Sequence, residues 1–124
     1  MKKNAVKLFF ALSVALLLLS LACTLIPSTT KNEEIIDGKK KAEIVILAVE
    51  QYKTKNGHYP ERMNELLPEF LKEIPITITG HPIEYQVDGD YYIVGFLLKK
   101  RAKIQESCGY IRRLSAWECS YSTE

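Results

Sequence analysis

The chain offers few side chains that could do chemistry. Its only histidines, His58 and His81, lie 23 positions apart in turn-like sequence without a CxxC or HxxxH partner, which indicates loop residues and not metal ligands. Asp88-Gly89-Asp90 lies between alternating segments and is typical of a hairpin turn, because a calcium loop needs about six oxygen ligands. Four glutamates recur every four residues, and Pro68 interrupts their common face, which favours a solvated edge over paired catalytic acids. They are Glu61, Glu65, Glu69 and Glu73. We therefore predict no catalytic residue, no metal site and no cofactor.

The N-terminal segment has the pattern of an export signal. Three lysines within the first seven residues precede an apolar run over residues 8–22 that only two serines interrupt. Ser20-Leu21-Ala22 places small side chains at the first and third positions before Cys23. A cysteine directly after such a site resembles the lipobox of bacterial lipoproteins, in which the thiol is acylated and becomes the new N-terminus, although Leu19 is four positions before it instead of the usual three. We predict a signal peptide over residues 1–22 and lipidation of Cys23.

The same segment allows a second interpretation, an uncleaved membrane anchor. Residues 8–26 carry no charge, and their length at about 1.5 Å per residue approaches the roughly 30 Å of a bilayer's hydrocarbon core. We favour cleavage because the run contains the small-x-small site and Pro27 soon follows. Either outcome exports residues 24–124 into an oxidising compartment.

Three cysteines are an odd number for an exported protein, which indicates a special role for one of them. Cys108 and Cys119 lie close together near the C-terminus, so we expect a disulfide between them while Cys23 takes the lipid. Such a bridge would stabilise the fold by about 3 kcal/mol in the chain-entropy description. The alternative is a pair of reduced cysteines in the core.

Length and charge limit the function classes. Of 124 residues, 102 remain after cleavage, which is one small domain; 47% apolar and 26% charged residues exclude a disordered or low-complexity chain. The whole chain has a net charge of +2, and loss of the three N-terminal lysines leaves 14 basic against 15 acidic residues. A nucleic-acid binder needs a basic surplus, so we exclude nucleic acid as a partner.

The residue pattern predicts an α+β fold with one long N-terminal helix, a short helical loop and a small antiparallel sheet of about four strands. We divide the mature chain into a lipidated cysteine and tether, residues 23–34, and a domain, residues 35–124. Thr30 with Glu33 fits a capping box, although Gly38 weakens the first turns. Apolar residues then keep one-face spacing up to Asn56-Gly57, and the long stretch without turn residues favours a helix over a strand at the β-branched residues 44–46.

The second half of the domain changes period. Pro60 opens a short helix over residues 61–67; Pro68 interrupts it, and Pro75 ends the helical region. Strands are predicted by residues of alternating or β-rich type on both sides of Asp88-Gly89 and again toward the C-terminus. Their ranges are 83–87, 91–98, 104–112 and 116–121.

Several phrases of the sequence resemble the globular domain of type II secretion pseudopilins, in particular the major pseudopilin, and of related type IV pilin-like proteins. The most specific is the helix end and turn AVEQYKTKNGHYPE at residues 48–61; the others are LLPEFL at 66–71, IEY at 83–85, YYIV at 91–94, CGY at 108–110 and WEC at 117–119. The resemblance covers about residues 35–121 and implies a pilin-like fold, a disulfide-closed last hairpin and partners in a secretion or pilus machine. We interpret Asn56, Gly57, Tyr59 and Pro60 as a structural turn motif without chemistry.

The chain departs from these families at its start. Pilins are cut after a glycine before their apolar helix and carry a glutamate five residues into it, whereas the first glycine here is Gly38 and the first acidic residue is Glu33. Some pseudopilins bind calcium in a late loop, but only Glu106, Glu118 and Glu124 follow Asp90, so no metal ligand is carried over.

A group of basic residues is the most distinctive surface feature that the sequence predicts. We expect these residues to gather at one end of the sheet, either to protect an edge from strand pairing or to contact anionic lipid headgroups or an acidic partner. They are Lys99, Lys100, Arg101, Lys103, Arg112 and Arg113.

The leading hypothesis is a non-enzymatic, lipid-anchored bacterial envelope protein that displays a pseudopilin-like domain and acts through protein contacts, with no small-molecule substrate. It faces the periplasm or the exterior. The resemblance to bacterial lipoproteins implies the outer membrane in a host with two membranes, because Thr24 stands where that family has an aspartate for retention in the inner membrane. One alternative is a membrane-spanning, pseudopilin-like component of a type II secretion or type IV pilus system. Another is a small exported enzyme or metal-binding protein.

Overall fold

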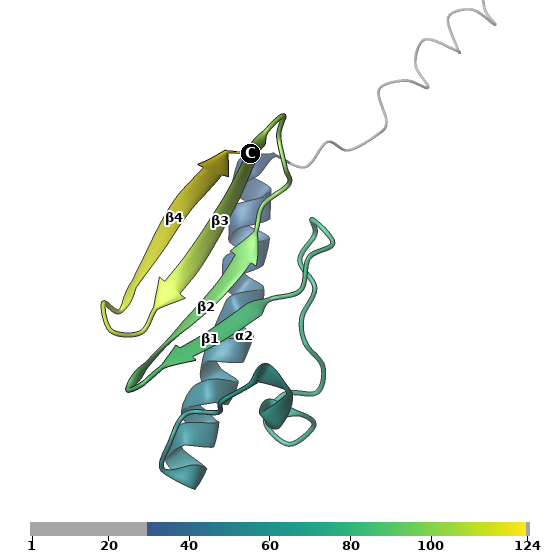
Figure 1. Ribbon diagram of the computed structural model, residues 1–124. Coiled ribbons are helices and arrows are strands. Elements are labelled where there is room, and N and C mark those ends of the chain that lie inside the picture. Colours follow the sequence, from purple (N-terminus) through teal and green to yellow (C-terminus); the bar gives the residue numbers. More distant parts are fainter. Residues whose placement is uncertain (1–29, 124) are drawn as a thin grey trace, which may run out of the picture.

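Figure 1 shows one long helix lying along one face of a four-stranded sheet in the computed structural model, which describes residues 30–123. The elements are helix α2 (Lys31–Asn56), the 3-10 helix η1 (Met63–Leu66) and strands β1 (Glu84–Asp88), β2 (Tyr91–Leu97), β3 (Ile104–Ile111) and β4 (Ala116–Thr123). The strands are antiparallel to their neighbours in the order β1-β2-β3-β4. The α+β class is confirmed, whereas the predicted signal peptide and Cys23 lie outside the described residues.

Local sequence signals fix both ends of helix α2. At its start the Glu33 backbone N–H donates to Thr30 Oγ1 at 3.3 Å and the Thr30 N–H donates to Glu33 Oε2 at 2.7 Å, which completes the predicted capping box. At its end Gly57 adopts a left-handed conformation with φ 83° and donates to the Lys53 carbonyl. The sequence analysis assigned residues 31–34 to the tether, but they belong to the helix because the capping box starts it at Lys31. The helix therefore does not begin at the N-terminus of the chain.

The core lies between α2 and β2. Ala42, Val45 and Val49 of the helix are fully buried, and so are Tyr92 and Val94 of the strand. Burial of each large apolar side chain contributes about 1.5–3 kcal/mol, so this face accounts for much of the stability. Small residues on the helix allow a close approach to the sheet.

The connection from helix to sheet is less helical than predicted. The expected helix over residues 61–67 shrinks to the 3-10 turn η1, which buries Leu66 and leaves Met63 and Leu67 partly buried against the core. The predicted hairpin at Asp88-Gly89 is confirmed, with Gly89 at φ 57° and Asp88 paired with Tyr91. The last strand runs to Thr123 and not to Tyr121.

Two tyrosines of the sheet tie it to the helix and to the turn. The Tyr92 hydroxyl donates to Glu50 Oε1 at 2.8 Å, and the Tyr85 hydroxyl donates to the Pro60 carbonyl at 2.8 Å. Burial, and for Tyr92 also the bond to Glu50, raises the pKa of both phenols above their usual value of about 10.

These raised pKa values predict a loss of stability in alkali. Below about pH 10 both phenols are protonated in the folded and unfolded chain, whereas above it the unfolded chain loses these protons first, so the unfolded state is favoured as pH rises. We expect the urea midpoint to fall between about pH 10 and pH 12, and to fall less steeply in the variant Tyr85→Phe/Tyr92→Phe. Equal slopes for the two proteins would contradict this assignment.

Candidate functional site

The turn motif at the end of α2, Asn56, Gly57, Tyr59 and Pro60, has structural contacts at each residue. The Asn56 side-chain amide donates to the Tyr52 carbonyl at 3.1 Å, and Gly57 forms the helix cap. The Tyr59 ring packs edge-on against Tyr92 at 5.0 Å between centroids, and Pro60 is buried. These contacts hold the helix end and the turn against the sheet.

The two late cysteines are joined. The β3–β4 register places Cys108 directly opposite Cys119, and a disulfide links them. Cys108 is buried and Cys119 is exposed, so the bridge connects the core to the outermost strand. The disulfide prediction is confirmed, and the alternative of two reduced core cysteines is wrong.

The predicted single basic patch is wrong, because the sheet topology separates its members. Lys99, Lys100, Arg101 and Lys103 lie between β2 and β3, whereas Arg112 and Arg113 lie between β3 and β4. In an antiparallel sheet these two connections are at opposite ends of the shared strand β3. An eight-residue strand rises about 3.3 Å per residue, which places the groups roughly 25 Å apart.

The two arginines after β3 are engaged within the domain. Arg112 Nε donates to Glu50 Oε1 at 2.7 Å, and the Arg113 guanidinium lies 5.7 Å from the centre of the Tyr91 ring. These contacts hold the β3–β4 turn to the helix and to β2, so we assign a structural role to this half of the basic group.

The basic group between β2 and β3 is fixed to the start of α2 by a buried carboxylate that the sequence analysis missed. Glu34 is 1% exposed, and its two oxygens accept from Arg101 Nη2 at 2.9 Å and from the Lys99 backbone N–H at 3.0 Å. A buried carboxylate is costly unless a positive charge and hydrogen-bond donors surround it, and Arg101 and the Lys99 N–H supply these. Nothing in the sequence separates Glu34 from its exposed neighbour Glu33 except the helical periodicity that puts Glu34 in line with Gly38 and Ala42.

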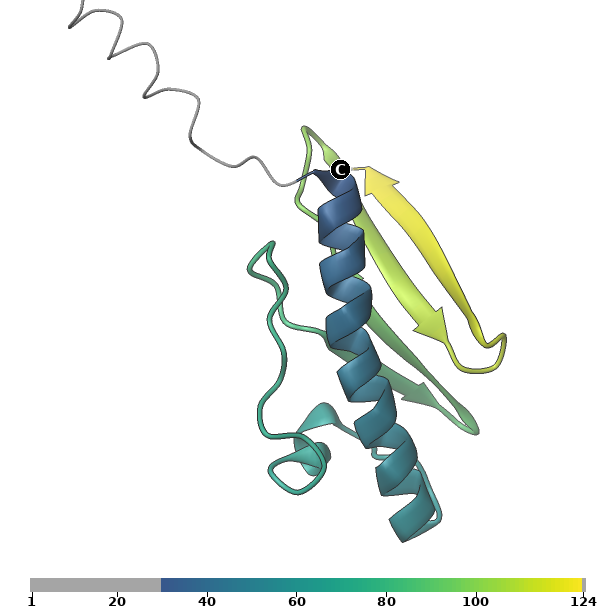
Figure 2. The ribbon, with the colours of Figure 1, turned by 180° about the vertical axis from the view of Figure 1, so that it is seen from behind.

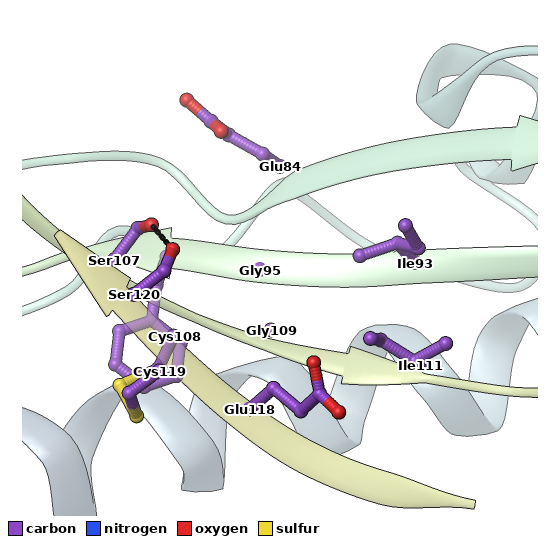
Figure 3. Close-up of a pocket in the computed structure, with 11 residues that line it drawn as sticks. Glu84, Ile93, Gly95, Ser107, Cys108, Gly109, Ile111, Glu118, Cys119 and Ser120 are labelled. Carbon is purple, nitrogen blue, oxygen red and sulfur yellow. Dashed lines mark hydrogen bonds between the residues drawn. A yellow bond between two sulfur atoms is a disulfide. The ribbon is translucent and has the colours of Figure 1, made fainter. Parts of the chain in front are cut away.

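A shallow hollow of about 280 Å³ lies on the face of the sheet opposite to α2 (Figure 3). Its floor is a pair of directly opposed glycines, Gly95 on β2 and Gly109 on β3. The same cross-strand row continues to Glu84 on β1 and to Glu118 on β4. Strands are spaced about 4.8 Å apart, so the two glutamate Cα atoms lie roughly 14 Å from each other.

The sides of the hollow differ in chemistry. Ile93 and Ile111 form an apolar side, and Ser107 and Ser120, whose hydroxyls are 3.4 Å apart, form a polar one. Figure 3 shows Glu84 and Glu118 on opposite sides of the two glycines. Among residues 30–123, no lysine or arginine forms an ion pair with either carboxylate. This arrangement suits a cation on an apolar stem, such as an arginine or lysine side chain.

The remaining candidates from the sequence are dispersed. His58 packs edge-on against Tyr52, and the backbone carbonyl of His81 accepts two bonds from Thr77. Asp88 accepts from the Tyr91 hydroxyl within the hairpin. Within the part of the chain that the structure describes, no three His, Cys, Asp or Glu residues are grouped as metal ligands, and no helix is long and apolar enough to cross a membrane.

The fold and these surfaces define a class: a disulfide-closed α+β domain with one helix packed on an antiparallel meander of four strands. Comparison with protein-family models, with curated proteins and with solved structures returned no match. The pseudopilin resemblance therefore stays a prediction that depends on the phrases quoted above.

Proposed function

We propose that this chain is a lipid-anchored bacterial envelope protein whose pseudopilin-like domain acts through protein contacts and performs no catalysis. The observation that carries the proposal is the division of the three cysteines. Cys108 and Cys119 bond to each other, which leaves Cys23, directly after the small-x-small site, as the cysteine for acylation.

The domain faces the periplasm or the exterior, and the outer membrane is favoured in a host with two membranes because Thr24 follows the acylated cysteine. An oxidising environment on that side of the membrane suits the Cys108–Cys119 disulfide. Several buried acyl chains, at about 0.8 kcal/mol for each methylene, make such anchoring effectively permanent.

The intact mass of protein extracted from membranes tests the anchor. We expect a chain that has lost residues 1–22 and gained a diacylglyceryl-sized group on Cys23. The variant Cys23→Ser is expected to leave the detergent phase, with Cys119→Ser as a control that keeps the anchor. A full-length chain without added mass would contradict lipidation.

The surface for protein contacts in this proposal is the glycine hollow. A basic side chain of a partner would lay its apolar stem on Gly95 and Gly109, beside Ile93, with a carboxylate at each end of the row. Partners that belong to a secretion or pilus machine are those that the family resemblance implies.

A small cation serves as the probe for this hollow. We expect N-acetyl-arginine amide to shift the backbone amide signals of Gly95 and Gly109 in nuclear magnetic resonance spectra of the labelled protein. Replacement of both carboxylates, Glu84→Gln/Glu118→Gln, should weaken this binding about fivefold, which is typical of exposed ion pairs. The matched control Glu61→Gln/Glu73→Gln removes the same charge away from the hollow and should leave the affinity unchanged. Glycine signals that do not move would exclude the hollow as a site for cations.

A second candidate keeps the domain but changes the anchor. The uncharged stretch over residues 8–26 is long enough to span a bilayer, which favours a membrane-spanning, pseudopilin-like component of a secretion or pilus system if Cys23 is not acylated. The mass measurement separates the two candidates.

A further inference from the structure

The loop between β2 and β3 lies at the end of the domain where the chain enters helix α2. We call residues 99–103 the basic loop. Figures 1 and 2 both show this loop beside the start of the helix, and the contacts of Arg101 and Lys99 with Glu34 join the two. The opposite end of the domain carries the end of α2 and the turns after β1 and β3.

Among residues 30–123, basic side chains outnumber acidic ones at this end: Lys31, Lys99, Lys100, Arg101 and Lys103 against Glu33, Glu34 and Glu106. Glu34 pairs with Arg101, and Glu106 pairs with Lys31 at 2.5 Å. The Glu33 carboxylate accepts from the Thr30 N–H in the capping box. The three lysines of the basic loop, Lys99, Lys100 and Lys103, have exposed side chains. They are part of the exposed surface at this end of the domain.

A short stretch of sequence connects this end to the membrane anchor. Six residues separate Cys23 from Thr30, and a fully extended chain spans at most about 3.6 Å per residue. The start of α2 therefore lies within about 25 Å of the anchoring cysteine. This distance limit rests on the proposed function, because it requires that the chain is anchored in a membrane ahead of Thr30. It holds both for an acylated Cys23 and for an uncleaved anchor.

We propose that the basic loop binds the anionic phospholipid headgroups of the membrane in which the chain is anchored. A bilayer is the surface that the short tether brings to this end, and lysine side chains close to anionic lipid are attracted to it within about one Debye length. The bond network around Glu34 fixes the loop to the helix, so binding orients the whole domain. Helix α2 then stands away from the membrane, and the glycine hollow remains open to a partner.

Lysine reactivity in vesicles tests the proposal on the full membrane-extracted protein. The protein is reconstituted into vesicles of phosphatidylcholine alone or with a third of phosphatidylglycerol, and its lysines are acetylated by a reagent that does not cross membranes. We expect Lys99, Lys100 and Lys103 to react about fivefold more slowly on the anionic vesicles, and the difference to disappear in high salt. Lys53 and Lys55, in the last turn of α2, should react equally on both.

A pair of charge-matched variants provides the control. Backbone hydrogen exchange of residues 99–103 should slow on anionic vesicles in the wild type and in Lys53→Gln/Lys55→Gln/Arg113→Gln, which removes three charges from the opposite end. It should not slow in Lys99→Gln/Lys100→Gln/Lys103→Gln. Equal reactivity of the basic loop on both vesicle types would overturn the proposal. The intact mass reports on the anchor separately, so either idea can fail without the other.

Discussion

Replacing Gly38 with alanine is expected to destabilise the domain by about 1–3 kcal/mol, although the same change in an exposed helix usually stabilises it by about 1 kcal/mol. Gly38 is buried in α2, and a Cβ atom there would lie 2.3 Å from two ring carbons of Phe96, which is itself 1% exposed. The Cγ atom of Phe96, near the base of the side chain, would also lie only 2.7 Å away, so the overlap requires the packed core or the helix to shift. Gly38→Val adds two further carbons and should lose about 3 kcal/mol or more.

The measurement is the free energy of unfolding in urea, and a second background identifies the cause. In a Phe96→Ala protein every side-chain atom that overlaps the new Cβ is absent, so in that background Gly38→Ala is expected to become neutral or stabilising. Gly57→Ala is a useful comparison because nothing lies within 4 Å of its Cβ position and its cost comes only from φ 83°. A gain in stability from Gly38→Ala in the wild type would show that the helix can shift away from β2.

Gly38 also shows what the sequence could and could not predict. Helix propensity alone identifies Gly38 as a weak point of the first turns, whereas in the structure it is a position where the helix packs directly against the Phe96 ring of β2. The difference arises because helix propensity depends only on nearby residues, whereas Phe96 lies 58 positions after Gly38 in the sequence. Both helix caps and the Asp88-Gly89 hairpin were predictable because their signals lie within a few residues.

The basic groups and the glycine hollow also depend on contacts between residues far apart in the sequence, which strand connectivity and register determine. Lys99 and Arg112 are near in sequence, yet one intervening antiparallel strand sends them to opposite ends of the sheet. The glycine hollow requires Gly95 and Gly109 to face each other, and a shift of one residue would place them on opposite faces. The disulfide was predictable from the cysteine count and from the oxidising compartment that the export signal implies, without knowledge of the register.

Arg101→Met is expected to lower the free energy of unfolding by about 2–3 kcal/mol. The substitution keeps an apolar stem but removes the guanidinium, so the fully buried Glu34 carboxylate retains only the Lys99 N–H as a partner. Loss of one member of a fully buried pair costs about 3–5 kcal/mol, and the value here is smaller because the Arg101 side chain is 42% exposed.

The double variant Glu34→Gln/Arg101→Met decides whether the uncompensated charge is the cause. A neutral amide at position 34 can still accept from the Lys99 N–H at the present 3.0 Å, and it carries no charge that needs the guanidinium. The double variant should therefore be more stable than Arg101→Met alone, although it contains one more substitution. Lys103→Met, at an exposed position of the same loop, should change stability by no more than about 0.5 kcal/mol. If the double variant is instead less stable than the single one, Arg101 stabilises the loop by packing and not by neutralising Glu34, and the electrostatic connection between the helix start and the basic loop is wrong.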